Sequence, residues 1–197
     1  MGKTLRPAGQ EGRTELSMTD LAAFWPFRPS RAQRDGEKLL AVVTQIARQP
    51  AFFGEGRALD TLQGRLELMM LHASLAFIRM RAEQGAEPLA QVFADKLFAQ
   101  FDSGLREAAV GDLSVPKRMR KIARSFYGRL EAYGAALKAN DRSALTAAIV
   151  RNVFAADAKG DAFAALLAAY TAATAAKQAA APLEALFTPD GWDAAPD

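Results

Sequence analysis

The stretch Leu66–Ile78, "LELMMLHASLAFI", decides the fold of this chain. Glu67, His72 and Ser74 are the only residues in it with polar side chains. A bilayer span needs about 20 apolar residues, so this shorter run predicts a buried helix and not a membrane segment. Because apolar residues occupy nearly every side of that helix, it should lie in the middle of a bundle. We therefore expect a central helix from residue 60 or 61 to about residue 83.

Helical patterns continue on both sides of this central helix. Alanine, leucine, arginine, glutamate and lysine abound and valine and isoleucine are scarce, a balance that favours helix over strand. Further helices are expected at about 31–48, 88–101, 116–138, 140–154 and 162–180, with shorter pieces at 102–109 and 182–187. The sequence thus predicts an all-α, single-domain bundle of six or seven helices without a sheet. We expect residues 1–29 to be a flexible lead, 30–188 the helical domain and 189–197 a loose tail.

The composition excludes several kinds of catalytic and metal site. The 197 residues include no cysteine, which excludes disulfides, thiolate metal sites and a cysteine nucleophile. His72 is the single histidine, so it has no second imidazole with which to hold a metal, and we interpret it as a hydrogen-bonded core residue. The chain has no phosphate loop, dinucleotide fingerprint or nucleophile elbow. We therefore expect no enzyme activity, no cofactor, no metal and no small-molecule substrate.

A second stretch, "SVPKRMRKIARSFYGRL" at residues 114–130, carries six basic residues and no acidic one. At about 100° per residue, four of them gather on one face of a helix, two lie on the flank of that face, and an apolar seam lies opposite. The four are Lys117, Arg120, Lys121 and Arg124, and the two are Arg118 and Arg129. Solvated helix faces usually mix acids with bases, and the helix dipole disfavours bases in the first turn. We expect these six residues to bind an anionic partner, either ribosomal RNA or anionic lipid headgroups; an ordinary solvated face is the alternative.

An aromatic cluster, "LAAFWPF" at residues 21–27, precedes the first expected helix. It places Phe24, Trp25 and Phe27 within four residues of one another. Free tails seldom carry so many aromatic side chains, which belong in cores and at interfaces. We expect these three to dock on the body of the protein or to contact a membrane or a partner.

Three stretches of the chain resemble the ubiquinol–cytochrome c chaperones, the assembly factors of respiratory complex III. They are Gln49–Glu83, Phe93–Val115 and Lys117–Leu137. The order of the segments and the series "GDLSV", Lys, "FYGR" and Tyr carry this resemblance, which covers about residues 38–140. The chain departs from the family pattern at Leu59, where a proline is usual, and at Gly134, where an acidic residue is frequent.

This resemblance implies an all-helical chaperone without enzyme activity. Members of the family bind newly made cytochrome b, and the mitochondrial ones also sit near the ribosomal tunnel exit and work with a small helper protein. The chain shows no Arg-rich, acid-poor transit peptide and is rich in alanine, so we expect a bacterial, cytoplasmic protein peripheral to the inner membrane. A helical nucleic-acid-binding module and a lipid-binding protein of the membrane surface are the alternatives.

Overall fold

A computed structural model describes residues 29–108, 114–154 and 161–196 of the chain. The chain divides into two compact units, residues 1–30 and 31–197, and every element described below belongs to the second. Within the described ranges six α-helices are present, and the only strand-like pairing is an isolated bridge between Phe53 and Ala58. The prediction of an all-α fold is therefore confirmed.

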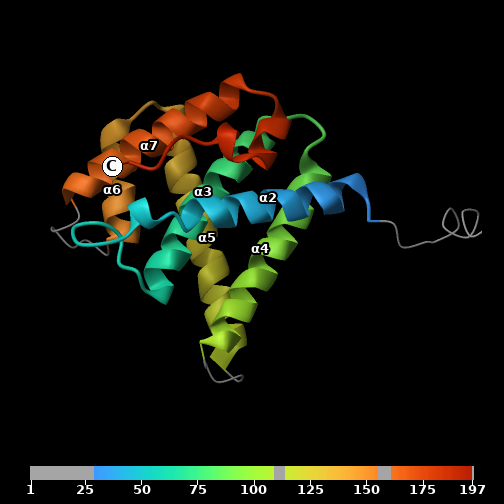
Figure 1. Cartoon of the computed structure of the whole chain (residues 1–197), viewed down its shortest axis with the longest axis horizontal. Helices are drawn as coiled ribbons and strands as arrows, with labels where there is room; N and C mark the ends of the chain where they lie inside the picture. The colour runs from blue at the N-terminus through green and yellow to red at the C-terminus, as the bar shows by residue number, and fades with distance from the viewer. Residues whose placement is uncertain (1–28, 109–113, 155–160, 197) are drawn as a thin grey trace, which may run out of the picture. The chain divides into compact units, whose positions relative to one another are not determined.

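The helices lie close to the expected ranges, and short 3-10 turns join or follow them (Figure 1). The α-helices are α2 (Arg31–Ala47), α3 (Leu62–Arg81), α4 (Glu87–Glu107), α5 (Val115–Lys138), α6 (Arg142–Val153) and α7 (Asp161–Ala180). The 3-10 turns are η1 (Pro50–Phe52), η4 (Leu183–Phe187) and η5 (Pro189–Gly191). One boundary was wrong: α4 runs unbroken through the position at which a separate short helix was expected after residue 101.

The helix ends follow from local chemistry. Thr61 caps α3 by accepting a hydrogen bond from the Gly64 amide (3.1 Å), and Asp141 caps α6 in the same way through the Ala144 amide (2.9 Å). Gly85 has a φ of 82° in the turn between α3 and α4, a conformation that side chains of other residues disfavour. These signals explain why the expected boundaries were accurate at these positions.

Helix α3 occupies the centre of the unit and packs against α2, α4, α5, α6 and α7. Its residues from Glu67 to Ala76 are all buried, including Ser74, whose hydroxyl donates to the Met70 carbonyl. Leu66, Phe77 and Ile78, at the two ends of the run expected to be buried, are half-buried and pack against the core from its edge. The central buried helix predicted from the sequence is thus confirmed, with three residues of the run Leu66–Ile78 nearer the surface. No helix in the described ranges is long and apolar enough to cross a membrane.

The end of the chain differs from the expected loose tail. Trp192 is 2% exposed, its ring lies 6.0 Å from the ring of His72, and its Nε1 donates to the Leu186 carbonyl (3.3 Å). Lys177 on α7 donates to the Trp192 carbonyl (2.9 Å). Gly191 is also buried, and a Cβ there would lie 1.9 Å from the Ala185 carbonyl oxygen, so no larger residue fits at this position. The described residues after 189 therefore close the core over α3 and α7.

Candidate partner-binding surface

Helix α5 presents an exposed basic face. Its members are Lys117, Arg118, Arg120, Lys121 and Arg124, and all five are exposed. Within the described part of the chain, none of the five side chains makes a hydrogen bond or an ion pair. The opposite side of α5 is fixed in the core by Ile122, Phe126 and Leu130. The helix is therefore held with its charges directed outward, in the orientation that the sequence pattern predicts.

The basic face lies on the half of α5 that pairs with the end of α4. Figure 1 shows these two helices side by side, meeting where α4 ends and α5 begins. Phe101 and Leu105 of α4 and Val115 and Ile122 of α5 are buried. Because apolar packing rather than charge pairing fixes this part of α5, its basic side chains are free to contact another molecule.

An aromatic side chain that the sequence analysis did not single out borders the basic face. Tyr127 is 52% exposed and lies one helical turn after Arg124. Its ring is 6.4 Å from that of Phe98 and 5.7 Å from that of Phe126. Helical spacing places Tyr127 outside the apolar seam of α5. The sequence could therefore have predicted that its side chain faces outward. A basic face with an aromatic border suits the contact of an anion that also has a flat or apolar part.

Arg129 does not belong to the basic face, which corrects its expected position on the flank. Its Nε and Nη2 donate to the two carboxylate oxygens of Glu67 on α3, at 2.6 and 2.7 Å, and its Nη1 donates to the Ser125 carbonyl. The Glu67 side chain is only 2% exposed and that of Arg129 14% exposed. Burial raises the pKa of Glu67, while Arg129 and a hydrogen bond from Gln63 oppose that rise. Arg129 therefore links α5 to α3 and is not available to a partner.

His72 is a core residue, as predicted. Its Nδ1 donates to the Leu68 carbonyl (2.7 Å), which leaves Nε2 to accept from the Tyr170 hydroxyl (3.0 Å). Burial lowers the pKa of His72 to about 4, so the ring is neutral at physiological pH. The described residues contain no group of histidine, aspartate and glutamate side chains that could hold a metal ion.

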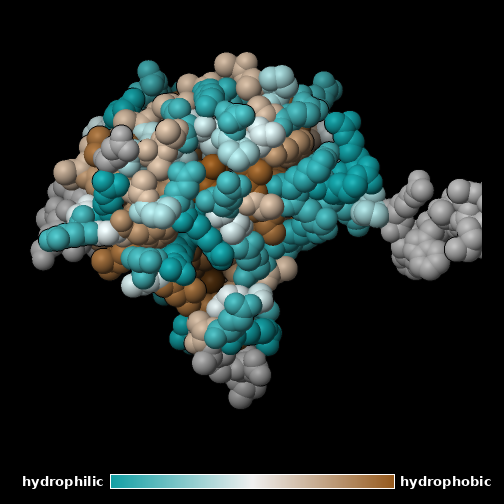
Figure 2. Space-filling model, in the orientation of Figure 1, coloured by the Kyte–Doolittle hydropathy of each residue, from teal (hydrophilic) through white to brown (hydrophobic). Residues whose placement is uncertain are grey.

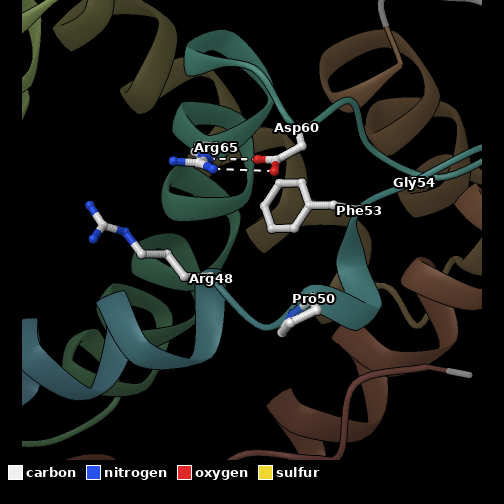
Figure 3. A pocket seen from close by; sticks show the side chains of 6 residues that line it. All are labelled: Arg48, Pro50, Phe53, Gly54, Asp60 and Arg65. Carbon is white, nitrogen blue, oxygen red and sulfur yellow. Dashed lines mark hydrogen bonds and ion pairs between the residues drawn. The ribbon is translucent and has the colours of Figure 1, made fainter.

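A hollow of about 550 Å³ lies beside the turn that leads into α3 (Figure 3). It is lined by Arg48, Pro50, Phe53, Gly54, Asp60 and Arg65. Asp60 accepts two hydrogen bonds from Arg65 (2.6 and 3.2 Å), which keep the pKa of the Asp60 carboxyl below its usual value. Asp60 is the only acidic residue that lines the hollow, and it forms an ion pair with Arg65. The lining residues therefore include no pair of groups suited to acid–base catalysis.

The surface around these sites mixes hydrophilic and hydrophobic residues. Figure 2 shows hydrophobic residues reaching the surface beside α2, among hydrophilic ones. The large hydrophobic side chains with the greatest exposure in the described ranges are Leu59, Leu62, Tyr127 and Leu166. Leu59 and Leu62 are close in sequence to Asp60, which lines the hollow beside α3.

The family model for the ubiquinol–cytochrome C chaperone matches residues 55–190, which is more than half of the chain. The chain belongs to this chaperone family. A solved relative supports the assignment, the crystal structure of the Cbp3 homolog from Brucella abortus. The two proteins are 40% identical, the match covers 81% of this chain and 89% of the relative, and the TM-score is 0.72. No curated protein matches the chain.

The basic face of α5 lies within the region that the family model matches. So do Tyr127, the Glu67–Arg129 ion pair and Trp192's contact residue Leu186. Four of the six residues that line the hollow beside α3 precede residue 55, outside the matched region. The aromatic residues Phe24, Trp25 and Phe27 lie outside the described residues, so their expected docking stays a prediction.

Proposed function

We propose that this chain is a non-enzymatic assembly chaperone that binds newly made cytochrome b and promotes assembly of ubiquinol–cytochrome c reductase. Membership of the chaperone family supports assembly of that complex as its role. Cytochrome b is the client because family members bind it, and a small helper protein could complete the complex.

The basic face of α5 holds the chaperone against a polyanionic surface where the client emerges. The observation that carries this proposal is that five exposed bases make no hydrogen bond or ion pair with other described residues, on a helix whose other side is buried. Each base near an anionic membrane surface contributes about 1 kcal/mol of attraction, and bases on RNA contribute through counterion release. We propose that this surface is that of the ribosome near the tunnel exit. The protein would then act in the bacterial cytoplasm, peripheral to the inner membrane.

An anionic membrane surface is the second candidate for the basic face. Tyr127 favours it, because tyrosine is enriched at membrane interfaces, where one end of the side chain is apolar and the other is wet. The same aromatic side chain could stack on an unpaired RNA base, so the two surfaces must be separated by experiment.

The test compares sedimentation with ribosomes and flotation with anionic liposomes. Arg120→Glu/Arg124→Glu reverses two charges of the basic face and should reduce ribosome association at least tenfold, with little change in flotation. The matched control, Arg142→Glu/Arg151→Glu, makes the same charge change at two exposed positions of α6 and should bind as the unaltered chain does. Loss of flotation alone would assign the basic face to the membrane. If neither measurement changes, the basic face is an ordinary solvated surface.

Capture of the client is tested separately. Tagged chaperone should retain cytochrome b from cells that are synthesising it, and the Arg120→Glu/Arg124→Glu variant should retain less because it meets fewer nascent chains. Absence of cytochrome b from the unaltered chaperone would contradict the proposed client.

A further inference from the structure

A groove of about 270 Å³ lies between the second half of α3 and the second half of α7. Its lining residues are Leu75, Ile78, Arg79, Ala82, Glu83, Ala175, Gln178 and Ala179. Pockets for drug-sized ligands start at about 300 Å³, so this groove has room for one or two side chains of a larger molecule and not for a cofactor. It is separate from the basic face of α5 and from the hollow beside α3.

Gln178 is unusual among the residues that line the groove. It is 2% exposed, and neither the nitrogen nor the oxygen of its carboxamide has a hydrogen-bond partner in the described part of the chain. Most buried polar side chains in folded proteins are hydrogen-bonded, because an unpaired buried group costs free energy. Gln178 lines the groove, and pairing of its carboxamide with a ligand would break no hydrogen bond of the described structure. A ligand in the groove would therefore gain both of these polar atoms as partners.

The charges at the rim of the groove are already neutralised. Arg79 donates from Nη1 to Glu83 (2.8 Å), from Nε to the Gln178 backbone carbonyl (2.8 Å) and from Nη2 to the Ala181 carbonyl (3.1 Å). Its side chain is 11% exposed, so the guanidinium is fixed at the end of α7 and offers little to an anion. The rest of the lining is aliphatic. The groove therefore suits a neutral, apolar ligand.

We propose that this groove binds a neutral, apolar peptide segment of a client protein. The Gln178 carboxamide would donate to a backbone carbonyl of the segment and accept from a backbone N–H, while an apolar side chain packs between Leu75, Ile78 and Ala175. A lipid tail could fill the same space but has neither a donor nor an acceptor for Gln178. That the peptide belongs to a client protein rests on the proposed chaperone function. Binding of an apolar peptide in the groove does not.

The probe for this site is a tripeptide of leucine, alanine and leucine, acetylated at its first residue and methylamidated at its last. Titration of the full-length, nitrogen-15-labelled chain should shift the side-chain NH₂ signals of Gln178. A depsipeptide, in which an ester oxygen replaces one N–H, should bind about tenfold more weakly because it lacks a donor for the carboxamide. An equal affinity for peptide and ester would overturn the proposed hydrogen bonds.

Two leucine variants separate ligand binding from folding. Gln178→Leu removes a carboxamide without a partner, so the melting temperature should stay the same or rise while affinity for the tripeptide falls at least tenfold. Gln100→Leu on α4 is the matched control, because Gln100 exchanges hydrogen bonds with Thr44 and lies outside the groove. It should lower the melting temperature slightly and leave tripeptide binding unchanged.

The outcomes for the groove and for the proposed function can be told apart. Unchanged tripeptide affinity in Gln178→Leu would show that the carboxamide is not a ligand-binding group. Failure of that variant to fold would contradict the premise that the carboxamide has no partner, and the comparison of peptide and ester on the unaltered chain would then decide whether it binds the ligand. Binding of the tripeptide without capture of cytochrome b would leave the groove intact and contradict only the proposed client.

Discussion

Arg129 of α5 and Glu67 of α3 form a two-point ion pair in which both side chains are largely buried. Arg129→Met leaves the Glu67 carboxylate without its partner, so we expect the free energy of unfolding to fall by about 3–5 kcal/mol in urea melts. The double variant Glu67→Leu/Arg129→Met removes both charges and should recover most of the loss. If Arg129→Met alone costs less than about 1 kcal/mol, the pair does not hold α5 to α3.

The same variant should also change the response of stability to pH. Burial raises the pKa of Glu67 and Arg129 opposes the rise, so the Glu67 pKa should rise further in Arg129→Met. A carboxyl whose pKa is higher in the folded state than in the unfolded state destabilises the fold as pH rises through those values. The free energy of unfolding that Arg129→Met loses relative to the unaltered chain should therefore be smaller at about pH 5 than at about pH 8. A deficit that is constant with pH would contradict this account of Glu67.

His72 should make the fold sensitive to acid. Its pKa falls from 6.5 in the unfolded chain to about 4 in the core, so the unfolded state binds more protons between those values. Stability should therefore decline as pH falls through this window, by about 3 kcal/mol in total. His72→Gln has no titratable group and should flatten this part of the pH profile of urea melts. A profile that is equally steep in this variant would assign the acid sensitivity to other groups.

Trp192 should contribute to stability although it lies five residues from the end of the sequence. Replacing a buried tryptophan with alanine removes a large apolar area and leaves a cavity, so Trp192→Ala should cost about 3–5 kcal/mol in chemical denaturation. The control is Asp190→Ala, at an exposed position of η5, which should be nearly neutral. If the two variants are equally stable, Trp192 does not contribute to the core, and this segment is the loose tail expected from the sequence.

The basic face should affect binding without affecting folding. Arg120→Glu/Arg124→Glu changes exposed side chains that make no ion pair with the residues the structure describes, so the melting temperature should stay within a few degrees. If four of these bases contact RNA, the slope of log affinity against log salt concentration should be about −3, and it should halve in the double variant. A slope that is the same in both proteins would mean that these arginines do not contact the nucleic acid.

Most of the fold could be predicted because its signals are local. The long apolar run of α3, the caps at Thr61 and Asp141 and the turn at Gly85 each depend on neighbouring residues. The orientation of α5 could be predicted for the same reason, since its apolar seam and its basic face repeat at helical spacing. The unbroken course of α4 could not, because Asp102, Ser103 and Gly104 are weak helix formers, which favours a break that the folded chain does not have.

The positions that were wrong depend on contacts between distant residues. On a helical wheel Arg129 lies only about 20° from Ile122, at the border of the apolar seam, and the partner that draws it inward is on another helix. Trp192 follows acidic and turn-forming residues with no helical period, and its burial comes from contact with His72. The unpaired carboxamide of Gln178 likewise depends on how α3 and α7 pack, which one sequence does not reveal.

The burial of Trp192 gives the protein an optical reporter of its own core. The chain has two tryptophans, Trp25 and Trp192, so Trp25→Phe leaves a single emitter next to the imidazole of His72. Its emission should be blue-shifted in the folded chain and should move to longer wavelength as the segment after η4 detaches. Because a protonated imidazole quenches indole fluorescence more strongly than a neutral one, the same signal should follow protonation of His72. One spectroscopic experiment without a label could then follow both the closure of the core and the titration of its buried base.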